Sequence, residues 1–166
     1  MEAVTAFKCL GTGIRCNAGL RNQVLKGRFE EAALEAARVE WLPLPMGAKA
    51  QLLAGLACQG CLYGVQVGGV PERAMLLLRN ACLKALWGTT RRLRCRELVF
   101  TLLVQGHRVD PQQALVYNCL VLFSKMMRKP GVREQAELAW TPVRQSGADD
   151  VAGPITTLMG IMQQLG

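Results

Sequence analysis

Cys58 and Cys61 are the residues whose types and spacing come closest to a metal or redox site. Two residues separate them, as in the Cys-x-x-Cys pairs of zinc-binding and redox proteins. A zinc site needs two further ligands, but the chain has no second such pair and a single histidine, His107. A redox pair would follow a strand, and residues 52–56 do not have a strand pattern. We therefore expect both cysteines to be small buried residues on one face of a helix.

His107 is the next residue that could do chemistry. It lies between Gly106 and Arg108, and the sequence suggests no Ser, Cys or Asp partner for a general base. We expect it at a helix end, interacting with terminal carbonyl groups.

Positive charge is concentrated in the middle of the chain. The net charge is +8, but residues 71–133 alone contain twelve Lys or Arg and three Asp or Glu, a net charge of +9. Four of the arginines form one cluster: Arg91, Arg92, Arg94 and Arg96. Such a concentration is typical of phosphate binding, in nucleic acid or at a membrane surface, although a solvated basic face is the alternative.

Composition predicts one mostly helical domain. The 166 residues are 51% hydrophobic, 19% charged and only 5% aromatic, which suits a core of Leu, Val, Ala, Met and Cys in packed helices. The seven cysteines are an odd number without a framework spacing or a preceding signal peptide, so we expect reduced thiols in an intracellular protein. Residues 50–70 are uncharged, but five glycines and three glutamines among them favour a buried helix and loop over a membrane span.

The pattern along the chain predicts the individual elements. Residues 4–14 indicate a hairpin or bent strand, and helices are expected at 22–40, 46–63, 71–87, 98–104, 111–128, 132–140 and 154–165, with a loop at 141–153. Asp110 should cap the 111–128 helix, with Gln113 completing a capping box. The helices should pack on one apolar stripe, formed by Leu52, Leu53, Leu56, Met75, Leu78, Leu86, Leu115 and Leu122.

Several segments, taken in order, resemble one known family. Lys8, Leu10, Gly11 and Ile14 follow the order Lys-x-Leu-Gly-x-x-Ile, and an amphipathic helix with Lys26 and Phe29 comes next. Three short motifs follow: Leu-Pro-Leu-Pro at 42–45, Leu-Tyr-Gly at 62–64 and Ala-Leu-Trp-Gly at 85–88. The arginine cluster at 91–96 comes directly after them. This order, over roughly residues 6–125, is similar to the primer grip, thumb and adjoining region of reverse transcriptases from LINE-type (non-LTR) retrotransposons. Cys9 stands where the family has Tyr or Phe.

The resemblance implies an all-α fold, mostly a helical bundle, with a short N-terminal β-hairpin or strand. Residues 1–18 would be a primer-grip-like hairpin, 19–131 a helical thumb-like domain, and 132–166 a weakly patterned tail with short helices. The parent enzymes synthesise DNA on an RNA template with magnesium. This chain would be a non-catalytic fragment that lacks the palm. It would have no catalytic, metal-binding or cofactor-binding residues. Its partners would be an RNA/DNA template–primer and the parent polymerase domains, with no small-molecule substrate and no membrane. The phosphate contacts would be Lys8, Gly11, Arg91, Arg92, Arg94 and Arg96.

Asp149 and Asp150 follow Gly147 and Ala148, which invites comparison with the aromatic-Ala-Asp-Asp box that holds two metal ions in polymerase palms. The aromatic residue is missing, the flanks are not apolar strands, and in the family this box precedes the Leu-Gly segment. Two-metal chemistry also needs carboxylates from elsewhere, and Asp110 is explained as a cap. We therefore reject a catalytic role.

Two other interpretations remain open. The uncharged central helix could dock a protein partner, which would make the chain a helical interaction module. Residues 106–125 resemble one unit of the pentatricopeptide helical-repeat family, although no second copy appears at the required period. The third interpretation is a degenerate retroelement reading frame without a selected function.

Overall fold

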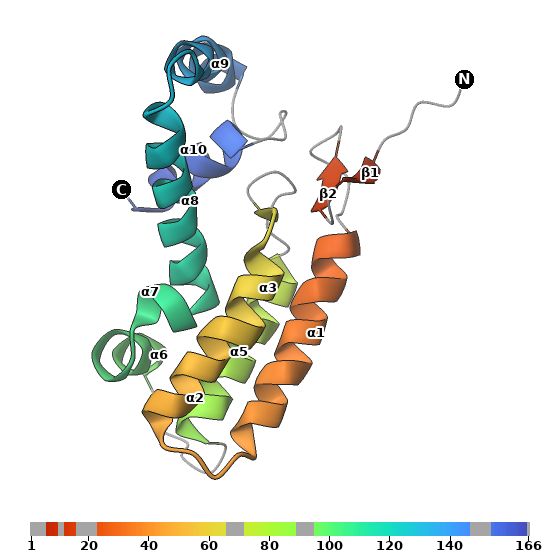
Figure 1. The fold of residues 1–166 in the computed structure, drawn as a ribbon, viewed down its shortest axis with the longest axis vertical. Coiled ribbons are helices and arrows are strands. Elements are labelled where there is room, and N and C mark those ends of the chain that lie inside the picture. Colours follow the sequence, from red (N-terminus) through yellow and green to blue (C-terminus); the bar gives the residue numbers. More distant parts are fainter. Residues whose placement is uncertain are drawn as a thin grey trace. The chain divides into compact units, whose positions relative to one another are not determined.

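The computed structural model describes residues 6–9, 12–15, 23–65, 72–88, 95–146 and 154–165 (Figure 1). Contacts divide the chain into two compact units. We call Leu25–Tyr63 with Pro71–Leu115 the core unit, and Met1–Val24 with Gly64–Val70 and Val116–Gly166 the terminal unit. Each unit joins segments that are far apart in the sequence, whereas the division expected at residues 18 and 131 follows chain order.

The fold is predominantly helical, as the composition predicts. In the terminal unit, strands β1 (Ala6–Cys9) and β2 (Thr12–Arg15) pair antiparallel, with Lys8 opposite Gly13. No helix within the described ranges is long and apolar enough to cross a bilayer.

Helix α1 (Gln23–Glu40) forms where the sequence alternates apolar and charged residues at helical spacing. It buries Leu25, Phe29, Ala32, Ala36 and Val39, while its glutamates stay at the surface. The Lys49 ammonium donates a hydrogen bond to the Glu40 carbonyl (2.7 Å), which fixes the turn into the next helix.

Helix α2 (Met46–Leu52) begins directly after Pro45, as expected of a residue that pre-sets the helical φ. The helical backbone then continues through a π-helical segment, η1 (Leu53–Cys58), into α3 (Gln59–Leu62). The buried positions are Ala50, Leu53, Ala57, Cys58, Cys61 and Leu62.

Helix α5 (Glu72–Trp87) packs against α2 and ends at Gly88, whose φ of 84° favours glycine. Its buried face contains Met75, Leu78, Cys82 and Leu86.

The rest of the core unit consists of short helices. Helix α6 (Arg96–Leu98) continues as a second π-helical segment, η2 (Val99–Leu103). Helix α7 (Gly106–Val109) then contacts both π-helical segments. Gly106 follows the helix expected at 98–104 and would suit its end, but in the structure Gly106 begins α7. A Cβ here would collide with the Gln113 side chain and would lie 2.7 Å from the Phe100 carbonyl oxygen, so only glycine allows this close approach.

Helices α8 (Pro111–Met127), α9 (Val132–Ser146) and α10 (Pro154–Leu165) complete the chain, and α9 contacts α10. Helix α8 contributes its first turn to the core unit and the remainder to the terminal unit. The loop expected from residue 141 is wrong in its first part, because α9 continues through Pro142 to Ser146. Pro142 lacks a backbone N–H, so the helix loses one hydrogen-bond donor there. At the preceding residue, the Thr141 hydroxyl donates a hydrogen bond to the Glu137 carbonyl (3.5 Å).

The expected apolar stripe is confirmed for Leu53, Met75, Leu78, Leu86 and Leu115, all of which are buried. Leu52 is half-buried. The assignment of Leu56 is wrong, since its side chain is 57% exposed. The i→i+5 spacing of η1 rotates the following residues and brings Ala57 and Cys58 inward instead. Leu122 is 41% exposed because it lies in the terminal unit and does not share the environment of Leu115.

Candidate functional site

The structure places two of the six predicted phosphate contacts. Lys8 lies in β1 and Arg96 is the first residue of α6, where its side chain is half-buried. Gly11, Arg91, Arg92 and Arg94 lie outside the described residues. Asp149 and Asp150 also lie outside them.

The arginine cluster is bounded in the sequence by two helix ends that the structure describes. The Gly88 amide donates to the Lys84 carbonyl (2.7 Å) and ends α5 three residues before Arg91. Helix α6 begins at the last arginine of the cluster, Arg96. The cluster therefore belongs to a connection between two helices of the core unit.

A buried ion pair links α5 to the residue that precedes α8. The Asp110 carboxylate is fully buried and accepts hydrogen bonds from Arg79 Nε (2.9 and 3.0 Å) and Nη2 (2.7 Å). Only 13% of the Arg79 side chain is exposed, and its guanidinium lies 5.8 Å from the centre of the Phe100 ring. Two parallel N–H···O bonds between the planar Arg79 guanidinium and the Asp110 carboxylate fix the orientation of both side chains. The pair therefore joins α5 to the start of α8.

Asp110 also caps α8, as the sequence predicts. Its Oδ1 accepts a hydrogen bond from the Gln112 amide (3.1 Å). The second half of the predicted capping box is wrong, because the Asp110 amide donates to the Gly106 carbonyl (2.9 Å). The Gln113 side chain packs beside Gly106 instead.

Glu97 connects this ion pair to the arginine cluster. Its carboxylate lies 3.7 Å from Arg79 Nη2, and it follows Arg96 in α6. A backbone hydrogen bond at Glu97 lowers the pKa of this carboxyl group, and the charges of Arg79 and Arg96 lower it further. The carboxylate therefore stays charged and makes an exposed ion-pair contact between α6 and α5.

A polar cleft of about 400 Å³ lies elsewhere in the core unit, between the α2–η1 helix and the segment that joins η2 to α7. Small residues such as Gly47, Ala54 and Gly55 form one side. Gln105 and Arg108 line the other, where Arg108 Nη1 donates to the Gln105 side chain (3.4 Å). Both π-helical segments contribute to this cleft, through Ala54 and Gly55 in one and Leu103 in the other. Arg108 thus adds one cation to the same unit as the cluster.

Cys58 and Cys61, the Cys-x-x-Cys pair, are buried, as predicted. The Cys58 thiol donates to the Val109 carbonyl (3.4 Å) and the Cys61 thiol to the Cys58 carbonyl (3.3 Å). Burial raises the pKa of Cys61 to about 12, and a hydrogen bond with Cys58 followed by burial raises the pKa of Cys82 well above its ordinary value. Such thiols stay protonated at neutral pH and pack as small apolar residues.

Metal ligation finds no support in the part of the chain that the structure describes, where no three His, Cys, Asp or Glu side chains converge as a metal site would need. His107 is exposed in the single turn of α7.

The role of Arg79 was not predicted from the sequence. Asp110 was expected only as a helix cap, and the arginines only as surface charge. The helical spacing could have indicated a buried role for Arg79. This residue follows the buried Leu78 and precedes the buried Cys82 by three positions, so it lies at the edge of the buried face of α5.

Comparisons with protein-family models, curated proteins and solved structures found no match for this chain. The similarity to LINE-type reverse transcriptases therefore rests on the order of residues in the sequence.

Proposed function

We propose that this chain is a non-catalytic nucleic-acid-binding module that corresponds to the thumb and adjoining region of a LINE-type reverse transcriptase. It holds a template–primer duplex by its phosphates and does not read base sequence. The net charge of +9 between residues 71 and 133 supports this function, because neutralising phosphates supplies most of the affinity of sequence-independent binders. The predominantly helical fold is compatible with a thumb.

The single observation that supports the proposal most is the position of Arg96, the last arginine of the cluster. Arg96 begins a helix whose next residue, Glu97, lies beside the buried Arg79–Asp110 pair. A cation at the start of a packed helix loses less conformational entropy on binding than one on a free tail. Four cations within six residues then match the closely spaced charges of a duplex backbone.

The hairpin has a secondary part in the proposal. Its register places Lys8 opposite Gly13, and Gly11 lies between the two strands in the sequence. A glycine-bearing hairpin lets backbone amides approach a sugar–phosphate chain closely, and Lys8 adds one cation.

A salt titration against a fluorescent RNA/DNA hybrid duplex tests this function. Affinity should fall steeply with salt and depend little on sequence. Replacing the four clustered arginines with Ala should weaken binding to all sequences alike and reduce the slope of log affinity against log salt by up to about four units. The changed residues are Arg91, Arg92, Arg94 and Arg96.

Two matched controls isolate the cluster. The same four positions changed to Lys keep the charge, and this variant should keep most of the salt slope. The double variant Lys26→Ala/Arg38→Ala removes two exposed cations from α1 and should change the slope by less than Arg91→Ala/Arg92→Ala does. Folded protein that fails to bind duplex at low salt, or four Arg→Ala changes without effect on the slope, would overturn the proposal.

A protein-interaction module is the second candidate, and one observation favours it. Leu98, Leu102 and Leu103 on α6 and η2 are each at least half exposed. Clustered exposed leucines often mark a protein-binding surface. This function predicts affinity for a protein that falls when these leucines become Ser and changes little with salt, which the same titration distinguishes from duplex binding.

A further inference from the structure

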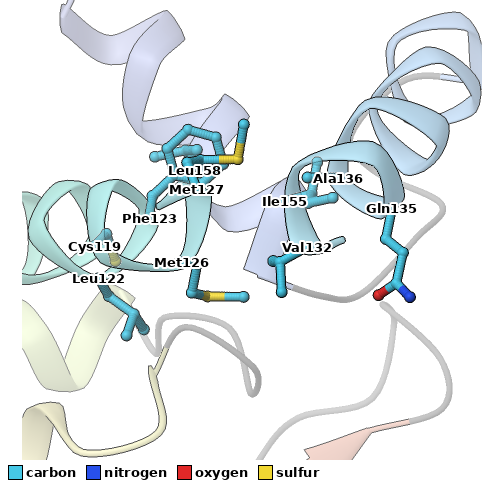
Figure 2. Close-up of a pocket in the computed structure, with 10 residues that line it drawn as sticks. All are labelled: Cys119, Leu122, Phe123, Met126, Met127, Val132, Gln135, Ala136, Ile155 and Leu158. Atoms are coloured by element: carbon cyan, nitrogen blue, oxygen red, sulfur yellow. The ribbon is translucent and has the colours of Figure 1, made fainter. Parts of the chain in front are cut away.

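The terminal unit contains an apolar cavity of about 190 Å³ among α8, α9 and α10 (Figure 2). Phe123 and Met127 of α8 and Leu158 of α10 cluster together at its back. Met126 of α8 and Val132 of α9 point to the same side of the opening in this view. Gln135 is the one polar residue among those that line it.

This cavity is accessible from solvent. Leu122 and Met126 are 41% and 37% exposed, so part of its apolar lining already faces water. Methionine side chains are flexible and polarisable, and they adapt to the shape of an inserted group. The volume suits one or two large side chains, because pockets that enclose a whole drug-sized ligand are about 300–1,000 Å³.

The turn beside the cavity is strongly basic. Between residues 125 and 133 there are four cations, Lys125, Arg128, Lys129 and Arg133, and no acidic residue. All four side chains are exposed. Arg133 pairs with Glu137 (3.0 Å), whereas none of the other three has a carboxylate within ion-pair distance among the described residues.

Two of these cations lie in the short turn that joins lining residues of the cavity. The Lys129 amide donates to the Met126 carbonyl (2.9 Å), and the Val132 amide donates to the Lys129 carbonyl (3.3 Å). Gly131 closes the turn with a φ of 78°. Met126, Met127 and Val132 line the cavity, so Arg128 and Lys129, which lie between them in the sequence, belong to the turn that borders it.

We propose that this cavity and its basic rim form a docking site for an acidic amphipathic helix of a partner protein. An apolar side chain of that helix enters the cavity beside Met126 and Phe123, and its carboxylates face Arg128 and Lys129. The complementarity of charge selects an acidic partner. A recessed cavity suits a protruding side chain, whereas a flat bilayer cannot fill it and a phosphate backbone has no apolar group to insert.

Fluorescence anisotropy with designed peptides and the full chain tests this site. The probe is a fluorescein-labelled helical peptide with Leu at i, i+3, i+4 and i+7 and Glu at its other exposed positions. A matched peptide with Lys in place of every Glu is the control. The acidic peptide should bind in a salt-sensitive manner, and the basic peptide should bind about tenfold more weakly or worse.

Variants locate the binding to this cavity. Leu122→Ser/Met126→Ser and Arg128→Glu/Lys129→Glu change exposed side chains, and each should weaken binding of the acidic peptide by about tenfold or more. Leu76→Ser/Leu77→Ser changes two exposed leucines of α5 in the core unit and should have no effect. Duplex binding should survive the Leu122/Met126 change, which separates this site from the proposed nucleic-acid function.

The proposal is overturned if both peptides bind equally, if neither binds, or if the Leu76/Leu77 variant weakens binding as much as the cavity variant does. Anionic vesicles serve as a further arm. Vesicle binding that depends on Leu122 and Met126, without peptide binding, would assign the surface to a membrane instead.

Discussion

Changing Asp110 to Asn should destabilise the fold by about 3 kcal/mol or more. The carboxylate is fully buried and receives three hydrogen-bond contacts of 2.7–3.0 Å from Arg79. Asparagine can still cap α8 through the Gln112 amide, so this change removes the charge and keeps the cap. Removing one partner of a buried ion pair typically costs about 3–5 kcal/mol. The remaining neighbour, Glu97, is 3.7 Å away and exposed, and a pair of that kind restores at most about 1 kcal/mol.

Urea unfolding followed by far-UV circular dichroism measures this cost as a shift of the midpoint at constant m value. Asp110→Ala should lose about 1 kcal/mol more than Asp110→Asn, because it also removes the cap. Arg79→Met alone should be similarly damaging, whereas the double variant Arg79→Met/Asp110→Asn should recover much of the loss, since no buried charge is then left unpaired. A cost below about 1 kcal/mol for Asp110→Asn, or single effects that simply add in the double variant, would refute this reasoning.

Two glycines and two thiols give further predictions. Gly106→Ala should destabilise by about 1–3 kcal/mol, because its Cβ would lie 2.7 Å from the Phe100 carbonyl oxygen. Gly27→Ala in α1, where a Cβ meets nothing within 4 Å, should stabilise by up to about 1 kcal/mol, and urea midpoints compare the two. Burial raises the pKa of Cys61 to about 12 and that of Cys119 to about 11, so above about pH 8.5 the unfolded chain releases thiol protons that the folded chain keeps. Stability should therefore fall between pH 9 and 10.5 by up to about 1.4 kcal/mol per pH unit for each thiol, and Cys61→Ala/Cys119→Ala should flatten this decline. An unchanged decline in that variant would contradict the assignment.

Local signals in the sequence predicted most of the helices. Helix α1 has a regular apolar stripe, α2 follows Pro45, α5 ends at Gly88, and α8 begins after Asp110, each for a reason that involves only neighbouring residues. Capping and periodicity act within one or two turns and are therefore visible in a single sequence.

The errors arose where tertiary contacts decide. Gly106 looks like a helix stop, but it begins α7, and glycine is needed there because Phe100 and Gln113 approach too closely for a Cβ. Leu56 has the helical spacing of a core residue, but η1 turns it outward. The Arg79–Asp110 pair joins residues 31 positions apart, and no local pattern identifies such a partner.

The predicted phosphate contacts remain a prediction, since four of the six lie outside the described residues. What the structure adds is the attachment of Arg96 to the core through Glu97. Charge counting located the basic region but could not distinguish the paired Arg79 from the clustered arginines.

The π-helical segments have a consequence for changes in chain length. A π-helical turn accommodates one residue more than an α-helical turn, so losing one residue within Leu53–Cys58 lets the backbone relax to α-helix without changing the phase of the flanking turns. The same loss inside α5 would rotate every later residue by about 100° and expose its buried face. Single-residue deletions should therefore be tolerated at η1 and η2, while the regular helices between them must keep their length.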